Sequence, residues 1–536
     1  MDAKTPDAAR VQGGGPPGGF RPGGGGPGMG GPPGMRGRRN LTEGPITKTL
    51  LMFSLPLLGG NFLQSLNGTV NQFWVSHTLG ATAITALGNS NVVMMLMLGS
   101  IFGVSMSANI LVAQSVGAGN MPMVKRVMGT AIVFFMALSL LVATFGGLAA
   151  PYILDAMRTP PESRAEAIIY LRIVFASVPF MYFFNFLQMA QRGAGDSNTP
   201  FYFMALAVIL DVILNPLLIR GIGPFPRMGI AGSAMSTFIG QGVSLCFLLI
   251  HLYRKDSVLA LKPPDFHYLK PYMEILQSLV TRGLPMGIQM LAMSGTAMVM
   301  IGFVNKYGAL TSAAYSISSM IWGYLQMPTM AIGGSVSSMA GQNVGAGRWD
   351  RVAKIARSGV LSGLVITGSL ALVLYAGNTI VLSFLLPSET PAQLALIAEA
   401  HHINMLSLWG FVIFSMTFSL SGVVRSTGAV WWPLVILVVS MVGVRIPFAI
   451  LLTPYLGKDA IWWSFPVGTI TSAALTTLYY LFGGWRKSRM LHSSAYGQAA
   501  DAGQSAPAMD PAEEDEEAAA VVAAAEAAKR PARVSS

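Results

Sequence analysis

The stretch that decides the fold reads Q-S-V-G-A-G at Gln114–Gly119, because it returns almost unchanged as Q-N-V-G-A-G at Gln342–Gly347. The two copies lie 228 positions apart, which is close to half of the 536 residues. A polar, glycine-rich loop repeated at this distance indicates a duplicated unit rather than a short-period solenoid. The repeated residues that we expect to matter for structure are Gln114, Gly117, Gly119, Gln342, Gly345 and Gly347.

Two further pairs of markers follow the same order at nearly the same offset. Pro56 and Pro285, 229 positions apart, each stand early in a long apolar run. Arg192 and Arg425, 233 positions apart, are each followed three residues later by a glycine. The sequence therefore predicts two related halves, which would form a pair of pseudo-symmetric lobes.

The composition indicates that the main solvent of the chain is lipid. It is 52% hydrophobic and only 11% charged, with a mean hydropathy of +0.55, whereas soluble domains carry about 25% charged residues. Runs long enough to cross a bilayer recur along the chain. We therefore expect an all-α integral membrane protein with two lobes of six transmembrane helices, near residues 48–76, 83–112, 127–149, 166–190, 199–219, 229–253, 275–304, 311–340, 355–380, 395–422, 431–453 and 460–483.

Changes in composition mark the boundaries between these parts. The chain divides into a Gly/Pro-rich tail expected to be disordered (1–40), a first lobe (41–253), a basic linker (254–274), a second lobe (275–490) and a tail with an acidic cluster at Glu513–Glu517 and an Ala-rich run (491–536). Low-complexity segments of this kind do not bury enough apolar surface to fold alone.

The net charge of +11 is explained by topology rather than by nucleic acid. With both termini in the cytoplasm, about 26 of the Lys and Arg residues fall on the cytoplasmic side, as the positive-inside rule requires. We therefore expect a multi-pass protein of the cell (inner) membrane whose partner is the lipid bilayer. We expect a monomer, because the two lobes already supply their own symmetry.

Polar residues gather in the first and fifth spans. Gln64, Asn67 and Asn71 crowd into one crossing, and Asn67 and Asn71 share a helical face. Asp211 and Asn215 stand one turn apart in the fifth span, and Asp211 is the acidic residue placed deep in a span. Carboxylates in this setting face a cavity and are usually functional, so we expect these five residues to form an ion-coupling site in a cavity; the alternative role of Asp211 is that of a structural hydrogen-bond acceptor.

Taken together, these features resemble the MATE family, the multidrug and toxic compound extrusion transporters. The resemblance covers about residues 44–486 and is carried by Pro56 with Gln64, by G-A-x-x-x-x-A at Gly80–Ala86, by both Q-x-V-G-A-G loops and by R-G-A-G-D-S-N-T-P at 192–200. It implies a V-shaped pair of lobes around a central cavity. It also implies export of small organic cations in exchange for H⁺ or Na⁺, without a cofactor, a metal or enzymatic activity.

The sequence departs from the family in its membrane carboxylates. Many prokaryotic members carry an Asp where Asn71 stands, and many have Asn followed by Asp in the fifth span, where this chain has Asp211 followed by Asn215. The resemblance therefore points to a branch with few membrane carboxylates. A single carboxylate favours H⁺, since Na⁺ prefers more anionic oxygens; Na⁺ coupling and a flippase for lipid-linked precursors are the alternatives.

The mechanism expected from these residues rests on Asp211. Burial favours the neutral form of a carboxyl group, which then exchanges a proton near neutral pH. Ionised Asp211 would hold the cation, and protonation from outside would release it. Methionine and aromatic side chains suit a deformable cavity wall, with packing as the alternative role. The candidate substrate contacts are Met290, Gln289, Trp322 and Tyr324.

Overall fold

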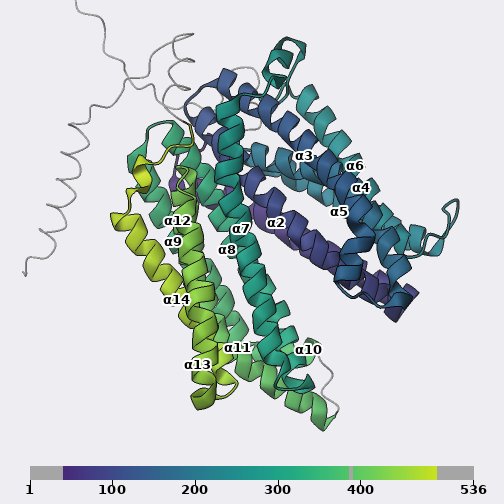
Figure 1. Cartoon of the computed structure of the whole chain (residues 1–536). Coiled ribbons are helices and arrows are strands. Elements are labelled where there is room, and N and C mark those ends of the chain that lie inside the picture. The colour runs from purple at the N-terminus through teal and green to yellow at the C-terminus, as the bar shows by residue number, and fades with distance from the viewer. Residues whose placement is uncertain (1–39, 386–389, 492–536) are drawn as a thin grey trace, which may run out of the picture.

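The computed structural model describes residues 40–385 and 390–491, almost all of them in long helices (Figure 1). The two tails and the acidic cluster Glu513–Glu517 lie outside the described residues. The first half contains α1 (Ile46–Leu79), α2 (Ala81–Gly117), α3 (Met121–Ala156), α4 (Pro161–Gly193), α5 (Asn198–Arg220), α6 (Ile230–Arg254) and the short 3₁₀ helix η1 (Pro263–Leu269). The second half contains α7 (Met273–Asn305), α8 (Ala309–Gly345), α9 (Trp349–Ala376), α10 (Asn378–Leu385), α11 (Pro391–Ser426), α12 (Trp431–Val438), the π-helical η2 (Val439–Val444), α13 (Arg445–Leu456), α14 (Asp459–Phe482) and η3 (Gly484–Lys487).

These helices make twelve crossings of membrane length. In the part of the chain that the structure describes, ten segments are long and apolar enough to span a bilayer, and one of them is the continuous unit α12–η2–α13. The other two crossings are α8 and α14, with 37 and 24 residues. The expected all-α architecture of twelve transmembrane helices in two lobes is confirmed. Several helices extend a few residues beyond the apolar runs predicted from the sequence.

The two lobes form the arms of a V (Figure 1). Helices α2–α6 make one arm and α7–α14 the other, and the arms meet at the end where the described chain begins and ends. The first lobe has its own apolar core, built around side chains such as Phe135, Tyr182 and Phe186. The second lobe has two main cores, one of them near Trp322 and Trp462.

Helix α1 belongs to both lobes. Leu50, Phe53 and Leu57 of its first turns pack in a core with Ile332 and Val336 of α8, while its later turns contact α5. The segment before α1 also contacts the second lobe, since the Asn343 side-chain amide of α8 donates to the Leu41 carbonyl oxygen at 3.0 Å. The sequence assigned 41–253 to the first lobe, and that boundary stays a prediction.

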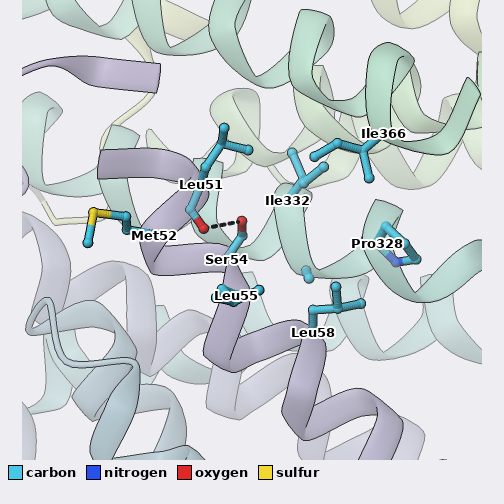
Figure 2. A pocket seen from close by; sticks show the side chains of 9 residues that line it. Leu51, Met52, Ser54, Leu55, Leu58, Pro328, Ile332 and Ile366 are labelled. Atoms are coloured by element: carbon cyan, nitrogen blue, oxygen red, sulfur yellow. Dashed lines mark hydrogen bonds between the residues drawn. The ribbon is translucent and has the colours of Figure 1, made fainter. Parts of the chain in front are cut away.

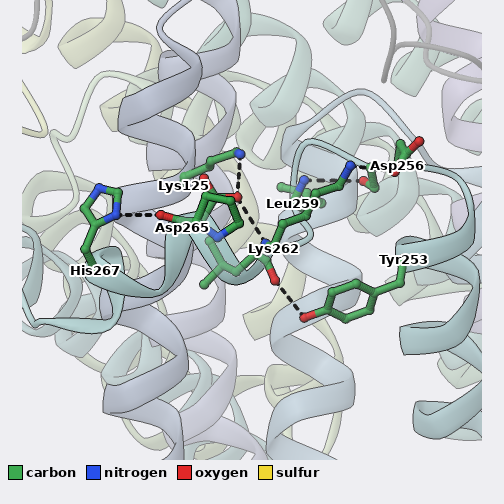
Figure 3. A network of polar contacts seen from close by, with 10 residues as sticks. Lys125, Tyr253, Asp256, Leu259, Lys262, Asp265 and His267 are labelled. Atoms are coloured by element: carbon green, nitrogen blue, oxygen red, sulfur yellow. Dashed lines mark hydrogen bonds and ion pairs between the residues drawn. The ribbon is translucent and has the colours of Figure 1, made fainter.

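The linker between the lobes is docked on α3 (Figure 3). Lys125 Nζ of α3 lies 2.6 Å from Asp265 Oδ2 of η1, and the Arg126 guanidinium stacks over Tyr272 at 5.1 Å. Burial alone would raise the pKa of Asp265, but hydrogen bonds from Lys125 and from the Lys262 backbone outweigh it and lower that pKa below its ordinary value. The linker is therefore a fixed part of the first lobe up to the start of α7.

Candidate functional site

Asp211 lies on α5 and is 2% exposed. Two hydroxyl groups of α6 face its carboxylate: Ser236 Oγ lies 2.5 Å and Thr237 Oγ1 3.2 Å from Oδ1. Helix α6 reaches this close because Gly240 has no side chain; a Cβ there would lie 2.9 Å from the Ala207 carbonyl oxygen. The bare glycine surface thus brings the donors of α6 to the carboxylate of α5.

Helix α1 completes this polar network. Asn67 donates a hydrogen bond to the Asp211 carboxylate. Asn71 Oδ1 accepts from Asn215 Nδ2 at 3.0 Å and from Ser233 Oγ at 2.5 Å. Four of the residues expected at the ion-coupling site, on two helices, therefore lie together. We call them, with Ser233, Ser236, Thr237 and Tyr170, the Asp211 network.

Tyr170 of α4 joins the network from the fourth helix. It is buried, and its phenol makes a hydrogen bond with Asn71. Neither Tyr170 nor the hydroxyl residues of α6 were predicted from the sequence to belong to the site. The spacing of Ser233, Ser236 and Thr237 was a usable signal, because positions three and four apart lie on one helical face. Tyr170 carried no comparable signal in the sequence.

The hydroxyl groups of α6 have a choice of acceptor. Ser236 Oγ lies 2.8 Å and Thr237 Oγ1 3.4 Å from the backbone carbonyl oxygen of Ser233, in addition to the Asp211 carboxylate. A hydroxyl has a single proton to donate. These donors satisfy an ionised carboxylate and can turn to the carbonyl when the carboxyl group is neutral. The network therefore accommodates both protonation states without leaving a donor unpaired.

A second polar face of α1 lines a groove against α8. The groove has a volume of about 500 Å³. Tyr324 of α8 lines it, which places one candidate substrate contact in a cavity; Gln64 of α1 is exposed and does not line it. The polar groups on the α1 side are Ser65, Thr69, Gln72 and Ser76. Helix α1 thus stands between the groove and the Asp211 network.

Two apolar cavities continue along α1 around Pro56. The larger cavity, of about 640 Å³, is lined by residues that include Pro56, Phe62, Tyr202, Tyr324 and Met327. In the smaller, about 280 Å³, Leu51, Leu55 and Leu58 of α1 face Pro328, Ile332 and Ile366 (Figure 2). Because Tyr324 borders both the polar groove and the larger apolar cavity, these spaces offer a contact surface for an amphiphilic molecule.

The other candidate substrate contacts have mainly structural partners. Trp322 is 8% exposed, and its indole donates to Asn404 Oδ1 at 3.1 Å inside the second lobe. Gln289 donates to the Pro433 carbonyl and accepts from Arg425, both at 3.1 Å. Met290 on the same helix is half-buried. The structure does not bring these three residues to the Asp211 network.

The repeated loops clasp the two lobes together. Gln114 Nε2 at the end of α2 donates to the Ser426 carbonyl of the second lobe at 2.7 Å, and Gln342 Nε2 at the end of α8 donates to the Gly193 carbonyl of the first lobe at 2.8 Å. We call this reciprocal pair the clasp. Gly119 and Gly347 follow it with the same positive φ of 69°, a conformation that glycine adopts without strain.

Small residues let α2 and α8 touch at the clasp. A Cβ at Gly117 would lie 1.9 Å from the Gln342 carbonyl oxygen, and one at Gly345 would lie 2.0 Å from that of Gln114. One turn or more away, Asn109 and Ser338 form a hydrogen bond at 3.3 Å. The hydrogen bonds of the clasp therefore lie beside a close backbone-to-backbone contact between α2 and α8.

Of the remaining markers, Arg192 and Arg425 directly precede the clasp acceptors Gly193 and Ser426, whereas Pro285 lies at another contact, between α7 and α2. Arg192, in the last turn of α4, has Nη1 3.9 Å from Met189 Sδ. Arg425, in the last turn of α11, has its guanidinium carbon 5.6 Å from the centroid of the Phe418 ring. Pro285 is buried in α7. It lies two residues from Gly283, whose Cβ position would be 2.8 Å from the Val104 backbone of α2.

The repeat seen in the sequence and the structure is also the repeat of a known family. The sequence model described as MatE matches residues 56–217 and again residues 285–451. The chain belongs to the MatE family. The two matches begin at Pro56 and Pro285, so the internal duplication is a property of the family.

Named relatives and solved structures agree with this assignment. The chain is 31% identical over 447 residues to the probable multidrug resistance protein YoeA of Bacillus subtilis, covering 83% of this chain and 95% of that protein. It is 28% identical to the probable multidrug resistance protein YpnP of the same organism, covering 84% and 98%. A solved structure described as the outward-facing conformation of a multidrug resistance MATE family transporter matches with a TM-score of 0.77 at 20% identity, covering 84% and 99%.

Proposed function

We propose that this chain is a multidrug efflux transporter that exports small organic cations across the cell membrane in exchange for H⁺. The observation that carries the proposal is the Asp211 carboxylate, which is buried in the membrane region and surrounded by neutral donors. The names of the relatives, both probable multidrug resistance proteins, support export of drugs. Both termini are assigned to the cytoplasm, which makes the clasp the inner gate.

The ligands around Asp211 favour H⁺ over Na⁺. Hard cations prefer several anionic or carbonyl oxygens, whereas Asp211 is met by the hydroxyl groups of Ser236 and Thr237 and the amide of Asn67. These groups donate to the carboxylate and turn their protons toward the position a cation would take. A proton instead binds the carboxylate directly, and the hydroxyl groups then have the Ser233 carbonyl as an alternative acceptor.

Exchange follows from the charge of one side chain. The negative charge of ionised Asp211 attracts the cationic substrate, which binds in the groove on the other side of α1. A proton from outside neutralises the carboxylate, the attraction ends and the substrate leaves. The lobes then rock, the clasp opens, and the proton passes to the cytoplasm. One proton entering for each singly charged cation leaving moves no net charge across the membrane, so the pH difference drives the exchange. Each pH unit supplies about 1.4 kcal/mol, which corresponds to a roughly tenfold substrate gradient.

The test is transport by the full chain in proteoliposomes loaded with ethidium. A pH gradient and a sodium gradient are applied separately to wild type, to Asp211→Asn and to the control Asp155→Asn, whose carboxylate is exposed and bonded to Arg164. We expect proton-driven transport in wild type and in the control, and loss of at least tenfold in Asp211→Asn. Wild-type rates in Asp211→Asn would remove Asp211 from the mechanism, and transport driven by sodium alone would replace H⁺ with Na⁺.

A further inference from the structure

The second lobe carries a charged residue where the first lobe has Asp211. In the first lobe, a Cβ on Gly240 of α6 would lie 3.5 Å from the Asp211 backbone nitrogen. The equivalent glycine 228 positions later is Gly468 of α14, and its Cβ would lie 3.3 Å from Arg445 Cβ. The same helix pair thus presents a carboxylate in one lobe and a guanidinium in the other.

A π-helical turn sets the register that brings Arg445 to this place. Ala207 and Ser440 lie 233 positions apart, and their carbonyl oxygens are the near neighbours of Gly240 and Gly468. Counting the same offset from Asp211 would give Val444, but η2 includes one residue more than an α-helical turn and moves Arg445 into contact with α14. π turns of this kind occur frequently at functional sites.

The surroundings of Arg445 differ from the Asp211 network. Its guanidinium lies over the Phe465 ring at 5.1 Å and makes a hydrogen bond with Tyr315. The residue is 8% exposed, and its Nε has no hydrogen-bond partner among the described residues. Where the first lobe has Asn71, the second has Met300, whose sulfur accepts from Ser464 at 3.9 Å. The polar network of the first lobe is thus replaced by aromatic and thioether groups.

Within residues 40–385 and 390–491, no carboxylate pairs with this guanidinium. The acidic groups of the neighbouring helices are used elsewhere: Glu399 lies 2.6 Å from Lys458, and Asp459 lies 2.9 Å from His402, where α11 and α14 begin. A guanidinium does not lose its proton in proteins. Unpaired charges inside a membrane protein mark ligand pathways, because the lipid environment otherwise disfavours them.

We propose that Arg445 is an anion-binding residue of the second lobe that receives a singly charged anionic group, either the carboxylate of a zwitterionic substrate or a free chloride ion. The planar guanidinium presents Nε and a neighbouring nitrogen as a fork that matches a carboxylate. This inference rests on the proposed function, since it assigns the cationic part of the same substrate to the Asp211 network. It widens the substrate class from cations to molecules that carry both charges.

The experiment compares two dyes that differ in one charge. Rhodamine B has a free carboxylate, and its ethyl ester is a cation of nearly the same shape. Binding to the full-length protein in nanodiscs is measured by fluorescence anisotropy, in chloride and in sulfate buffers of the same ionic strength. The variants are Arg445→Gln, Arg445→Lys and the control Arg164→Gln, which removes an exposed arginine in the first turn of α4.

If the anion is a substrate carboxylate, wild type binds rhodamine B about tenfold more tightly than the ester, and Arg445→Gln removes that preference by weakening rhodamine B alone. If the anion is chloride, replacing it with sulfate, which is doubly charged, weakens binding of the ester in wild type but not in Arg445→Gln. Arg164→Gln behaves as wild type in both cases. A preference that survives Arg445→Gln, or a wild type that responds to neither carboxylate nor chloride, would overturn the proposal.

Two further measurements keep the test decisive. If Arg445→Gln fails to fold, Arg445→Lys serves in its place. It keeps the charge but not the planar fork, so it is expected to retain only part of the preference for rhodamine B over the ester. The comparison of the two dyes in wild type needs no variant. Binding in nanodiscs needs no ion gradient. A protein that shows carboxylate binding through Arg445 but no proton-driven transport therefore refutes the proposed function and not this inference.

Discussion

Replacing Gly345 by alanine is expected to open the clasp. The new Cβ would lie 2.0 Å from the Gln114 carbonyl oxygen, whereas contacts under 3.0 Å are essentially never seen. Helices α2 and α8 must therefore separate by about 1 Å or more, which breaks the hydrogen bonds of Gln114 and Gln342 at 2.7 and 2.8 Å. Each hydrogen bond contributes about 0.5–1.5 kcal/mol, or about 1–3 kcal/mol for the two. The population of the clasped state relative to the unclasped state therefore falls by roughly five- to 150-fold.

The assay is a distance measurement between the open ends of the two arms. Spin labels replace the exposed side chains Tyr152 of α3 and Tyr455 of α13 in a background in which the free Cys246 is changed to Ala. We expect Gly345→Ala to shift the distance distribution to shorter values, because opening the clasp lets the far ends approach. Gly323→Ala on the same helix is the control, since its Cβ would meet nothing within 4 Å. An unchanged distribution in Gly345→Ala, or an equal shift in the control, would refute the role of the clasp.

Two further predictions concern the polar network and the linker. Asn71→Met gives the first lobe the residue that the second lobe has in Met300. It leaves the donors of Asn215 and Ser233 unpaired, at a cost in folding stability of about 1–3 kcal/mol for each, and should lower both the melting temperature and proton-driven ethidium transport. An unchanged melting temperature would contradict the hydrogen bonds at 3.0 and 2.5 Å. The pKa of Asp265 lies below its ordinary value of 3.8, so the stabilisation from Lys125 is present at neutral pH and is lost as the pH falls through the lowered pKa. The protease resistance of the linker should therefore be lower in Lys125→Met than in wild type at neutral pH. Equal resistance would show that the ion pair does not hold the linker on α3.

Much of the fold follows from the sequence because its signals are long and repeated. Twelve apolar runs are readable one by one, and the offset between the Gln114 and Gln342 loops identifies the two halves. The same reasoning placed Asn67, Asn71 and Asp211 together, since polar groups in a membrane must find partners inside the protein. Periodicity within one helix says which face is polar, and burial then requires that face to meet another.

The rest depended on contacts between helices that one helix does not encode. The sequence does not show that the first turns of α1 pack on α8, since Leu50 and Phe53 are equally apolar toward either lobe. It also does not show the π turn before Arg445, which is a local departure from regular hydrogen bonding rather than a residue pattern. Trp322 carried the right chemistry for a substrate contact, but its indole is taken by Asn404.

The docked linker has a consequence for how such a molecule can be assembled. The Lys125–Asp265 ion pair and the contact of Arg126 with the Tyr272 ring hold the residues before α7 on α3. The clasp and the shared helix α1 join the halves independently of the peptide bonds between them. Continuity of the backbone near Met273 is therefore not what keeps the halves in register. Two polypeptides synthesised separately and divided at that point would still have complementary surfaces for pairing, which is how a fused gene can descend from a dimer.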